Sequence, residues 1–250
     1  MYSWGRIRQT ADPALFSSSA GSAGVFLDFD GTLSEIVARP HLAQPAPGAI
    51  AVLLSLVRVY RLVTVVSGRP TDEVARLLGV KGVRYEGCYG LESRASTQAV
   101  LSEVAAAASA VAGAWAEPKG ASVAVHYREA RDPVSAGEAL ARGLRRVAGW
   151  HGLELIEGKK VLELVPAGAS RKGGVVERLA AETGLTAAVY AGDDAPDLEA
   201  FTALDRLAAA GTTTMKIAVR GDETPGDFLA AADVVVDGPT GLIAFLRRLA

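Results

Sequence analysis

The chain contains a single cysteine, Cys88, among its 250 residues, so no disulfide can form within it. A zinc site built from several thiolates is excluded for the same reason. Such sparse use of cysteine is typical of proteins from a reducing compartment, and we predict a cytoplasmic location. Any bound metal should therefore be held by oxygen ligands.

The sequence also lacks an excess of charge of one sign and a long apolar run. Its 26 Lys and Arg residues and 28 Asp and Glu residues give a formal net charge of −2. Nucleic acids and anionic membranes attract strongly basic segments, which are missing here. The longest nearly apolar tract, residues 104–116, is too short to span a bilayer and predicts a buried helix. We expect neither a nucleic-acid partner nor membrane association.

Hydrophobic residues are abundant instead, at 50% of the chain, which excludes intrinsic disorder. At this length they predict one large domain, or a main domain that carries a smaller one. Two short apolar runs, residues 24–27 and 61–66, end at the polar residues Asp28 and Ser67. Such runs are typical of buried parallel strands with binding residues at their carboxyl ends. Helical spacing over residues 46–60 completes a strand-helix-strand unit.

The same pattern returns near the C-terminus, so we expect both ends of the chain to form one α/β fold. The expected elements are a helix over 175–183 closed by Gly184 and strands over 186–190, 216–219 and 234–236.

The middle of the chain predicts a different unit, from about residue 95 to residue 165. Its expected elements are a long Ala-rich helix, a strand over 122–128, a helix over 133–149, and strands over 153–157 and 159–165. Alternation gives these strands two unlike faces. The face expected to pack on the helices contains Val123, Val125, Tyr127, Leu162 and Leu164. The opposite, polar face contains Ser122, His126, Arg128, Lys159 and Glu163. An insert with such a face is typical of a lid over a site.

Residues suited to phosphoryl transfer follow the first predicted strand, in the segment Asp28-Phe29-Asp30-Gly31-Thr32. Asp28 could ligate Mg²⁺ and attack phosphorus, while the backbone N–H groups after Asp30 could bind phosphoryl oxygens. By itself the segment is equally compatible with an ordinary Asp-Gly turn. Three later residues favour the functional interpretation: Ser67 can donate a hydrogen bond to phosphate, Lys172 can neutralise it, and Asp193 can ligate the metal.

These four motifs, in this order, resemble the signature of the haloacid dehalogenase (HAD) superfamily of phosphohydrolases over nearly the whole chain. The interval from Asp28 to Ser67 holds barely one strand-helix-strand unit, so only the interval from Ser67 to Lys172 can hold a cap. The resemblance implies an α/β fold with a HAD-like Rossmannoid parallel-sheet core of residues 1–93 and 167–250. An α+β cap domain of the C2 type would be inserted at residues 94–166.

Within the superfamily, the chain is similar to the trehalose-phosphatase family. The similarity rests on motifs that other HAD enzymes lack, Glu117-Pro118-Lys119 leading to His126-Tyr127-Arg128 and Gly158-Lys159 with Glu163. It implies Mg²⁺-dependent hydrolysis of trehalose 6-phosphate through an aspartyl-phosphate, and a functional pairing with a trehalose-phosphate synthase.

The resemblance also implies a role for each matching residue. Asp28 would be the nucleophile, Asp30 the general acid and base, and Ser67 and Lys172 would bind the phosphoryl group. The metal would be held by Asp28, the Asp30 carbonyl and Asp193, supported by Asp194 and Asp197. The implied substrate-binding residues are Gly31, Thr32, Arg69, Glu117, Lys119, His126, Arg128, Lys159 and Glu163.

The sequence departs from the family pattern at two places. Gly-Cys-Tyr-Gly occupies residues 87–90, where the family usually has Gly-Asn-His-Gly, and Leu198 stands where it usually has glutamate, with Glu199 one place out of register. We expect Tyr89 to pack half-buried or to hydrogen-bond in the cleft. These departures leave open a different glycosyl phosphate, such as mannosyl-3-phosphoglycerate or sucrose 6-phosphate, or a non-catalytic sugar-phosphate sensor.

Overall fold

The computed structural model describes residues 16, 18–87, 98–119, 122–166 and 171–250. The chain forms two compact units, and we call residues 1–90 with 171–250 the core unit and residues 91–170 the inserted unit. The expected domain boundaries at 93/94 and 166/167 stay predictions, because both fall in or beside segments outside the described residues.

A six-stranded sheet, parallel throughout and ordered β10-β9-β8-β1-β2-β3, organises the core unit. Its strands are β1 (Ala23–Leu27), β2 (Leu62–Val66), β3 (Arg84–Glu86), β8 (Ala187–Gly192), β9 (Thr213–Arg220) and β10 (Val234–Asp237). The first strand lies between β8 and β2, so segments from both ends of the chain meet at the centre of the sheet. The expected α/β fold is confirmed.

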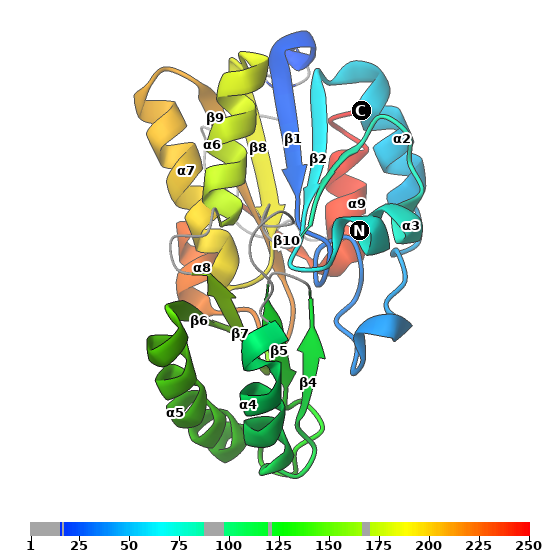
Figure 1. Cartoon of the computed structure of the whole chain (residues 1–250). Helices are drawn as coiled ribbons and strands as arrows, with labels where there is room; N and C mark the ends of the chain where they lie inside the picture. The colour runs from blue at the N-terminus through cyan, green and yellow to red at the C-terminus, as the bar shows by residue number, and fades with distance from the viewer. Residues whose placement is uncertain (1–15, 17, 88–97, 120–121, 167–170) are drawn as a thin grey trace. The chain divides into compact units, whose positions relative to one another are not determined.

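Helices cover both faces of this sheet (Figure 1). One face carries α2 (Ala49–Val59), α3 (Thr71–Leu78) and α9 (Gly238–Leu246), and the other carries α6 (Lys172–Thr183), α7 (Leu198–Ala209) and α8 (Gly226–Ala231). Alternate residues of β1 enter the two apolar layers, since Val25 and Leu27 belong to the first layer and Phe26 to the second. Burial on both faces explains why this strand is continuously apolar.

Glycines define several helix ends in the core unit. The expected helix over 46–60 begins later, at Ala49, because Gly48 adopts a left-handed conformation with φ of 90°. The helix α6 ends where predicted, at Gly184, whose φ of 62° suits a left-handed C-terminal cap. The backbone preference of glycine therefore sets both boundaries.

An antiparallel sheet ordered β4-β5-β7-β6 forms the inserted unit. Its strands are β4 (Trp115–Pro118), β5 (Val123–His126), β6 (Leu153–Gly158) and β7 (Val161–Pro166), with helices α4 (Gln98–Ser109) and α5 (Pro133–His151). Val123, Val125, Leu162 and Leu164 pack in one apolar cluster with these helices, and Tyr127 packs against it. The face assignment made from alternation is confirmed for these residues.

The buried helix expected over 104–116 is wrong in its second half. The helix α4 ends at Ser109, and Trp115 and Ala116 belong to the strand β4. Gly113 lies between them with φ of 84°, and a Cβ there would lie 2.4 Å from the Glu129 carbonyl oxygen. This left-handed, closely packed glycine reverses the chain into an edge strand.

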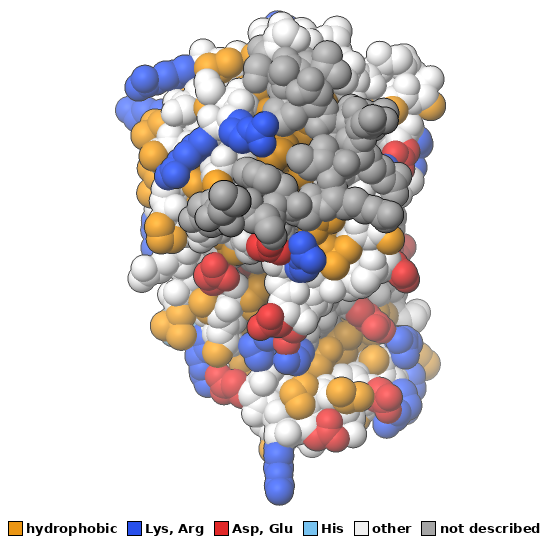
Figure 2. All heavy atoms as spheres, turned by 180° about the vertical axis from the view of Figure 1, so that it is seen from behind, with side chains coloured by type: hydrophobic (Ala, Val, Ile, Leu, Met, Phe, Trp, Pro, Cys, Tyr) orange, Lys and Arg blue, Asp and Glu red, His pale blue; other side chains and the backbone are white. Residues whose placement is uncertain are grey.

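Among the described residues, no helix is both long and apolar enough to cross a membrane. Figure 2 shows both acidic and basic side chains among the described residues of the face that it draws.

Candidate active site

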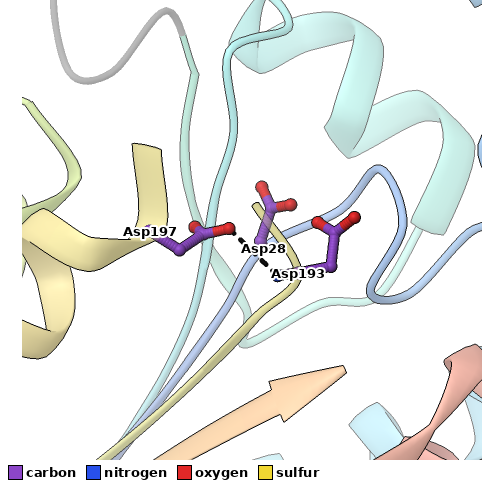
Figure 3. Close-up of side chains that lie close together, drawn as sticks. All are labelled: Asp28, Asp193 and Asp197. Atoms are coloured by element: carbon purple, nitrogen blue, oxygen red, sulfur yellow. Dashed lines mark hydrogen bonds between the residues drawn. The ribbon is translucent and has the colours of Figure 1, made fainter. Parts of the chain in front are cut away.

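Two acidic side chains come from neighbouring strands of the core unit at the same edge of its sheet. Leu27, the last residue of β1, pairs with Ala191 of β8, and the Asp28 N–H donates to the Ala191 carbonyl at 2.9 Å. This register brings Asp28 beside Asp193, as Figure 3 shows, with Asp197 approaching from the start of the next helix. Ligand oxygens of the three aspartates all lie within 4.8 Å of one another. All three residues are buried.

Lys172, the first residue of α6, lies between two of these carboxylates. Its Nζ is 2.8 Å from Oδ1 of Asp28 and 2.7 Å from Oδ1 of Asp197. Burial alone would lower the pKa of Lys172, but Asp197 and Asp28 outweigh it and raise that pKa. Burial raises the pKa of Asp28, an effect that Lys172 opposes and the neighbouring aspartates reinforce. An additional cation beside Asp28 would favour its ionised, nucleophilic form.

Asp197 organises this cluster by accepting four hydrogen bonds. Its Oδ1 accepts from Lys172 and, at 2.6 Å, from the hydroxyl of Tyr190, whereas Oδ2 accepts from the N–H groups of Asp193 and Asp194 at 3.0 and 3.1 Å. Burial, followed by the nearby aspartates, raises the pKa of Tyr190, so its hydroxyl stays a donor. Asp197 thus fixes both the lysine and the loop that carries Asp193.

The turn after Asp30 is shaped to fit against Asp193. Gly31 has φ of 81°, and a Cβ there would lie 1.9 Å from an Asp193 carboxylate oxygen, so only glycine fits. The Thr32 hydroxyl donates to Asp193 at 3.5 Å. The N–H groups of Gly31 and Thr32, expected to face phosphate, donate to the carbonyls of Ser34 and Phe29 within the turn.

The guanidinium of Arg69 pairs with Asp30 rather than with the aspartate cluster. Its Nε and Nη2 donate to the two Asp30 carboxylate oxygens at 2.7 and 2.8 Å. Ser67, buried at the end of β2, accepts a hydrogen bond from the Arg69 backbone N–H at 3.1 Å. Burial alone would lower the pKa of Arg69, but Asp30 and Glu73 raise it, so the guanidinium stays charged.

A separate polar cluster lies in the inserted unit, on the face of its sheet opposite to the helices. The His126 ring lies 2.7 Å from Glu117 and stacks on Trp115 with ring centres 4.2 Å apart. Lys119 lies 3.9 Å from both Glu117 and Glu163. Arg128 also donates to the Lys159 carbonyl at 2.8 Å, so each of the six predicted substrate residues of this unit contacts or lies close to another member of the set.

The aspartate cluster could hold a metal ion. Asp28 and Asp193 offer hard carboxylate oxygens from strand ends, which suit Mg²⁺. Asp197 lies in the same cluster, but its oxygens already accept four hydrogen bonds, so it is better placed to support the other two. The three carboxylates exceed the single ammonium of Lys172 by two charges, which a divalent cation would balance.

The structure describes one of the two places where the sequence departs from the family pattern, the segment with Leu198 and Glu199. Leu198 packs against the apolar layer between α6 and α7, and Glu199 pairs with Arg171. Neither residue belongs to the aspartate cluster. Cys88 and Tyr89 lie outside the described residues, so the expectation for Tyr89 stays a prediction.

Three residues with clear contacts in these clusters were not predicted from the sequence. Tyr190 was a polar side chain within an apolar strand, and this irregularity could have marked it. Glu73, which accepts a hydrogen bond from Arg69, stands four residues after it at a helix start, a spacing typical of ion pairs. Trp115 gave no usable signal, because its segment was assigned to a helix.

The core unit has a parallel sheet with aspartates at the ends of its central strands and a buried lysine at the start of the helix α6, and an antiparallel unit is inserted in its sequence. These features define a HAD-like fold. The solved C-terminal domain of C. albicans trehalose-6-phosphate phosphatase superposes with a TM-score of 0.81 at 20% identity, covering 98% of each chain. A trehalose-6-phosphate phosphatase from Aspergillus fumigatus gives a TM-score of 0.64 at 23% identity, again over 98% of each chain.

The sequence profile described as Trehalose-phosphatase matches residues 26–233, and the chain therefore belongs to the trehalose-phosphatase family. It is 37% identical to a trehalose-phosphate phosphatase of Mycolicibacterium paratuberculosis, covering 96% of this chain and 66% of that relative. A Mycobacterium leprae trehalose-phosphate phosphatase is 34% identical over 93% of this chain and 58% of the relative. The chain thus spans less than two thirds of the length of these relatives.

Proposed function

We propose that the protein hydrolyses trehalose 6-phosphate to trehalose and phosphate. The observation that carries this proposal is a cluster in a chain of the trehalose-phosphatase family. Asp28 and Asp193 come from adjoining strand ends, and Lys172 and Asp197 come from helix starts. A nucleophilic carboxylate beside a buried ammonium suits attack on an anionic phosphate, because the ammonium offsets the charge that repels the nucleophile.

In the first step, a carboxylate oxygen of Asp28 attacks phosphorus. A P–O bond to Asp28 forms while the bond from phosphorus to the sugar oxygen breaks. The protonated Asp30 carboxyl gives its proton to the departing sugar oxygen, and trehalose leaves. Lys172 and the Ser67 hydroxyl bind the phosphoryl oxygens during the transfer.

In the second step, a water oxygen attacks the phosphorus of the aspartyl-phosphate. Asp30, now a carboxylate, takes a proton from this water as the new P–O bond forms. The bond between phosphorus and the Asp28 oxygen then breaks, which releases phosphate and restores both carboxyl groups. Covalent catalysis replaces one difficult displacement by two easier ones.

Asp28, the Asp30 carbonyl and Asp193 would hold Mg²⁺, with Asp197 and Asp194 keeping the Asp193 loop in place. When bound, the ion supplies positive charge that neutralises the phosphoryl group and keeps Asp28 ionised. Gly31 supports this arrangement because its missing Cβ leaves room for the Asp193 carboxylate.

The polar cluster of the inserted unit would recognise the sugar, with that unit acting as a cap. A disaccharide offers many hydroxyl groups. Carboxylates can accept hydrogen bonds from these hydroxyls and cationic side chains can donate to them, and the contacts among these side chains fix their positions. The residues proposed for sugar contact are Glu117, Lys119, His126, Arg128, Lys159 and Glu163. Closure of the cap would exclude bulk water, and its opening would release trehalose.

Phosphate release by the purified protein tests this proposal. It should be measured with Mg²⁺ or with EDTA, on trehalose 6-phosphate, glucose 6-phosphate, sucrose 6-phosphate and mannosyl-3-phosphoglycerate. We expect turnover of trehalose 6-phosphate with Mg²⁺, loss of it with EDTA, and loss in Asp28→Asn but not in Asp227→Asn, which changes an exposed aspartate of α8.

Each other outcome contradicts a different part of the proposal. Preference for another glycosyl phosphate would refute the substrate, and substantial turnover by Asp28→Asn would refute the nucleophile. Binding of trehalose 6-phosphate without any turnover would instead favour a non-catalytic sensor. The cytoplasmic location and the functional pairing with a trehalose-phosphate synthase stay predictions from the sequence.

A further inference from the structure

The buried guanidinium of Arg69 binds the carboxylate of the more exposed Asp30. The Arg69 side chain is only 6% exposed, whereas the Asp30 side chain is 35% exposed. Both Asp30 oxygens accept from Arg69, at 2.7 and 2.8 Å. Such a two-point pair fixes the plane of a carboxylate as well as its position. The arginine therefore holds Asp30 from behind and leaves its outer side accessible.

The remaining contacts of Arg69 anchor it in this orientation. Its Nη1 donates to the Pro40 carbonyl at 3.0 Å and to the carboxylate of Glu73 in the first turn of α3. Its guanidinium also lies over the Phe29 ring, 5.4 Å from the ring centre. Three separate segments of the core unit thus fix the position of one guanidinium.

Counting donors shows what Arg69 has left for a substrate. A guanidinium has five N–H groups, and four of them are used by Asp30, Pro40 and Glu73. A direct bidentate contact with phosphate, as expected for a substrate-binding arginine, would need two. Arg69 would have to break one of its existing bonds to make that contact.

We infer that Arg69 is a positioning residue that acts through Asp30, and that Glu73 and the Pro40 carbonyl keep Arg69 in place. The inference rests on the proposed function, in which Asp30 transfers a proton in each step. Proton transfer requires the carboxyl to lie within hydrogen-bond reach of the sugar oxygen and then of the water. Loss of the pair would let the Asp30 side chain rotate, which would slow the chemical steps without weakening substrate binding.

The test compares kcat and KM for trehalose 6-phosphate in Arg69→Met, Arg69→Lys and the control Arg76→Met, which changes an exposed arginine of α3. A misplacement of about 1 Å can cost about a hundredfold in rate. We expect kcat to fall about a hundredfold in Arg69→Met and about tenfold in Arg69→Lys, which keeps the charge but offers only one nitrogen. KM should change less than about threefold in both, and the control should match the unmodified protein.

Two further measurements separate positioning from a general loss of structure. Adding guanidinium ion to Arg69→Ala should restore part of kcat, because the ion can bind beside Asp30. In an Asp30→Asn background, Arg69→Met should lower kcat no further, since residues that act as one unit are not additive. Arg69→Lys and the guanidinium experiment keep the inference testable if Arg69→Met fails to fold.

A rise in KM with unchanged kcat in Arg69→Lys would overturn the inference and return Arg69 to direct phosphate binding. Fully additive losses in the double variant would overturn it as well. Failure of the proposed function is distinguishable, because then the unmodified protein itself would release no phosphate from trehalose 6-phosphate.

Discussion

The four hydrogen bonds accepted by Asp197 make Asp197→Asn a demanding test of the aspartate cluster. Asparagine has the same shape, but it carries one oxygen and one NH₂ group where aspartate carries two oxygens. Whichever way the amide is turned, its NH₂ group must face two donors. These are either the pair Lys172 and Tyr190 or the N–H groups of Asp193 and Asp194.

The expected cost follows from the bonds that are lost. Hydrogen bonds to charged groups contribute about 1.5–3 kcal/mol each, so losing two of them costs about 3–6 kcal/mol. Removing the Asp197 charge also relieves its repulsion of Asp28, which offsets part of this cost. We therefore expect Asp197→Asn to lower the free energy of unfolding of the core unit by about 3 kcal/mol.

The measurement must report on the core unit. Trp115 and Trp150 lie in the inserted unit, so tryptophan fluorescence would follow mainly that unit. Urea unfolding of the full chain, followed by far-UV circular dichroism in EDTA, gives the loss of stability. Hydrogen exchange of the peptide that carries the Asp193 and Asp194 amides should accelerate about a hundredfold, as expected for about 3 kcal/mol.

The control is Asp227→Asn, which makes the same chemical change at an exposed site and should cost less than about 0.5 kcal/mol. If Asp197→Asn unfolded within about 1 kcal/mol of this control, with unchanged exchange at Asp193 and Asp194, the reasoning would be refuted. The cluster would then not depend on Asp197 for its position.

Two other predictions concern Gly31 and Asp132. Gly31→Ala should weaken Mg²⁺ activation about tenfold in a titration of phosphate release, because its Cβ would displace the Asp193 carboxylate; unchanged activation would contradict this. The hydroxyl and N–H of Ser135, with the N–H of Val134, lower the pKa of Asp132. Asp132 therefore stabilises α5 fully above the ordinary aspartate pKa of about 3.9, and this effect is lost as the pH falls through the lowered pKa. The difference in melting temperature between Asp132→Ala and the unmodified protein should be largest at about pH 7 and should shrink as the pH is lowered below about 3.9; a constant difference would contradict this cause.

The parallel core could be predicted because strands that are buried on both faces of a sheet are continuously apolar in sequence. Runs such as residues 24–27 are continuously apolar and stop at a polar residue. The inserted unit was harder, because its Ala-rich tract favours a helix by intrinsic propensity. The helix ends at Ser109, and Gly113 then packs against the Glu129 carbonyl, a contact between separate segments that no local pattern reveals.

In the site, contacts that depend on strand order could be predicted, whereas contacts that depend on the direction of a long side chain could not. The proximity of Asp28 and Asp193 follows from the fold, since adjacent parallel strands end at the same sheet edge. The partner of Arg69 could not be predicted in this way. Its guanidinium reaches Asp30 through a long side chain whose direction depends on Glu73 and on a carbonyl in another loop.

The central position of β1 has a consequence for synthesis on the ribosome. This strand pairs with β2 on one side and with β8 on the other, and the whole inserted unit is translated between β1 and β8. The inserted unit is continuous in sequence, so it can complete its sheet while one edge of β1 still lacks a neighbour. Asp28 is therefore translated before the inserted unit, but it can meet Lys172 and Asp193 only after that unit has been translated. A nascent chain stalled before β8 would expose an unpaired apolar strand, which is a template for aggregation, and would lack the cluster of Asp28, Lys172 and Asp193.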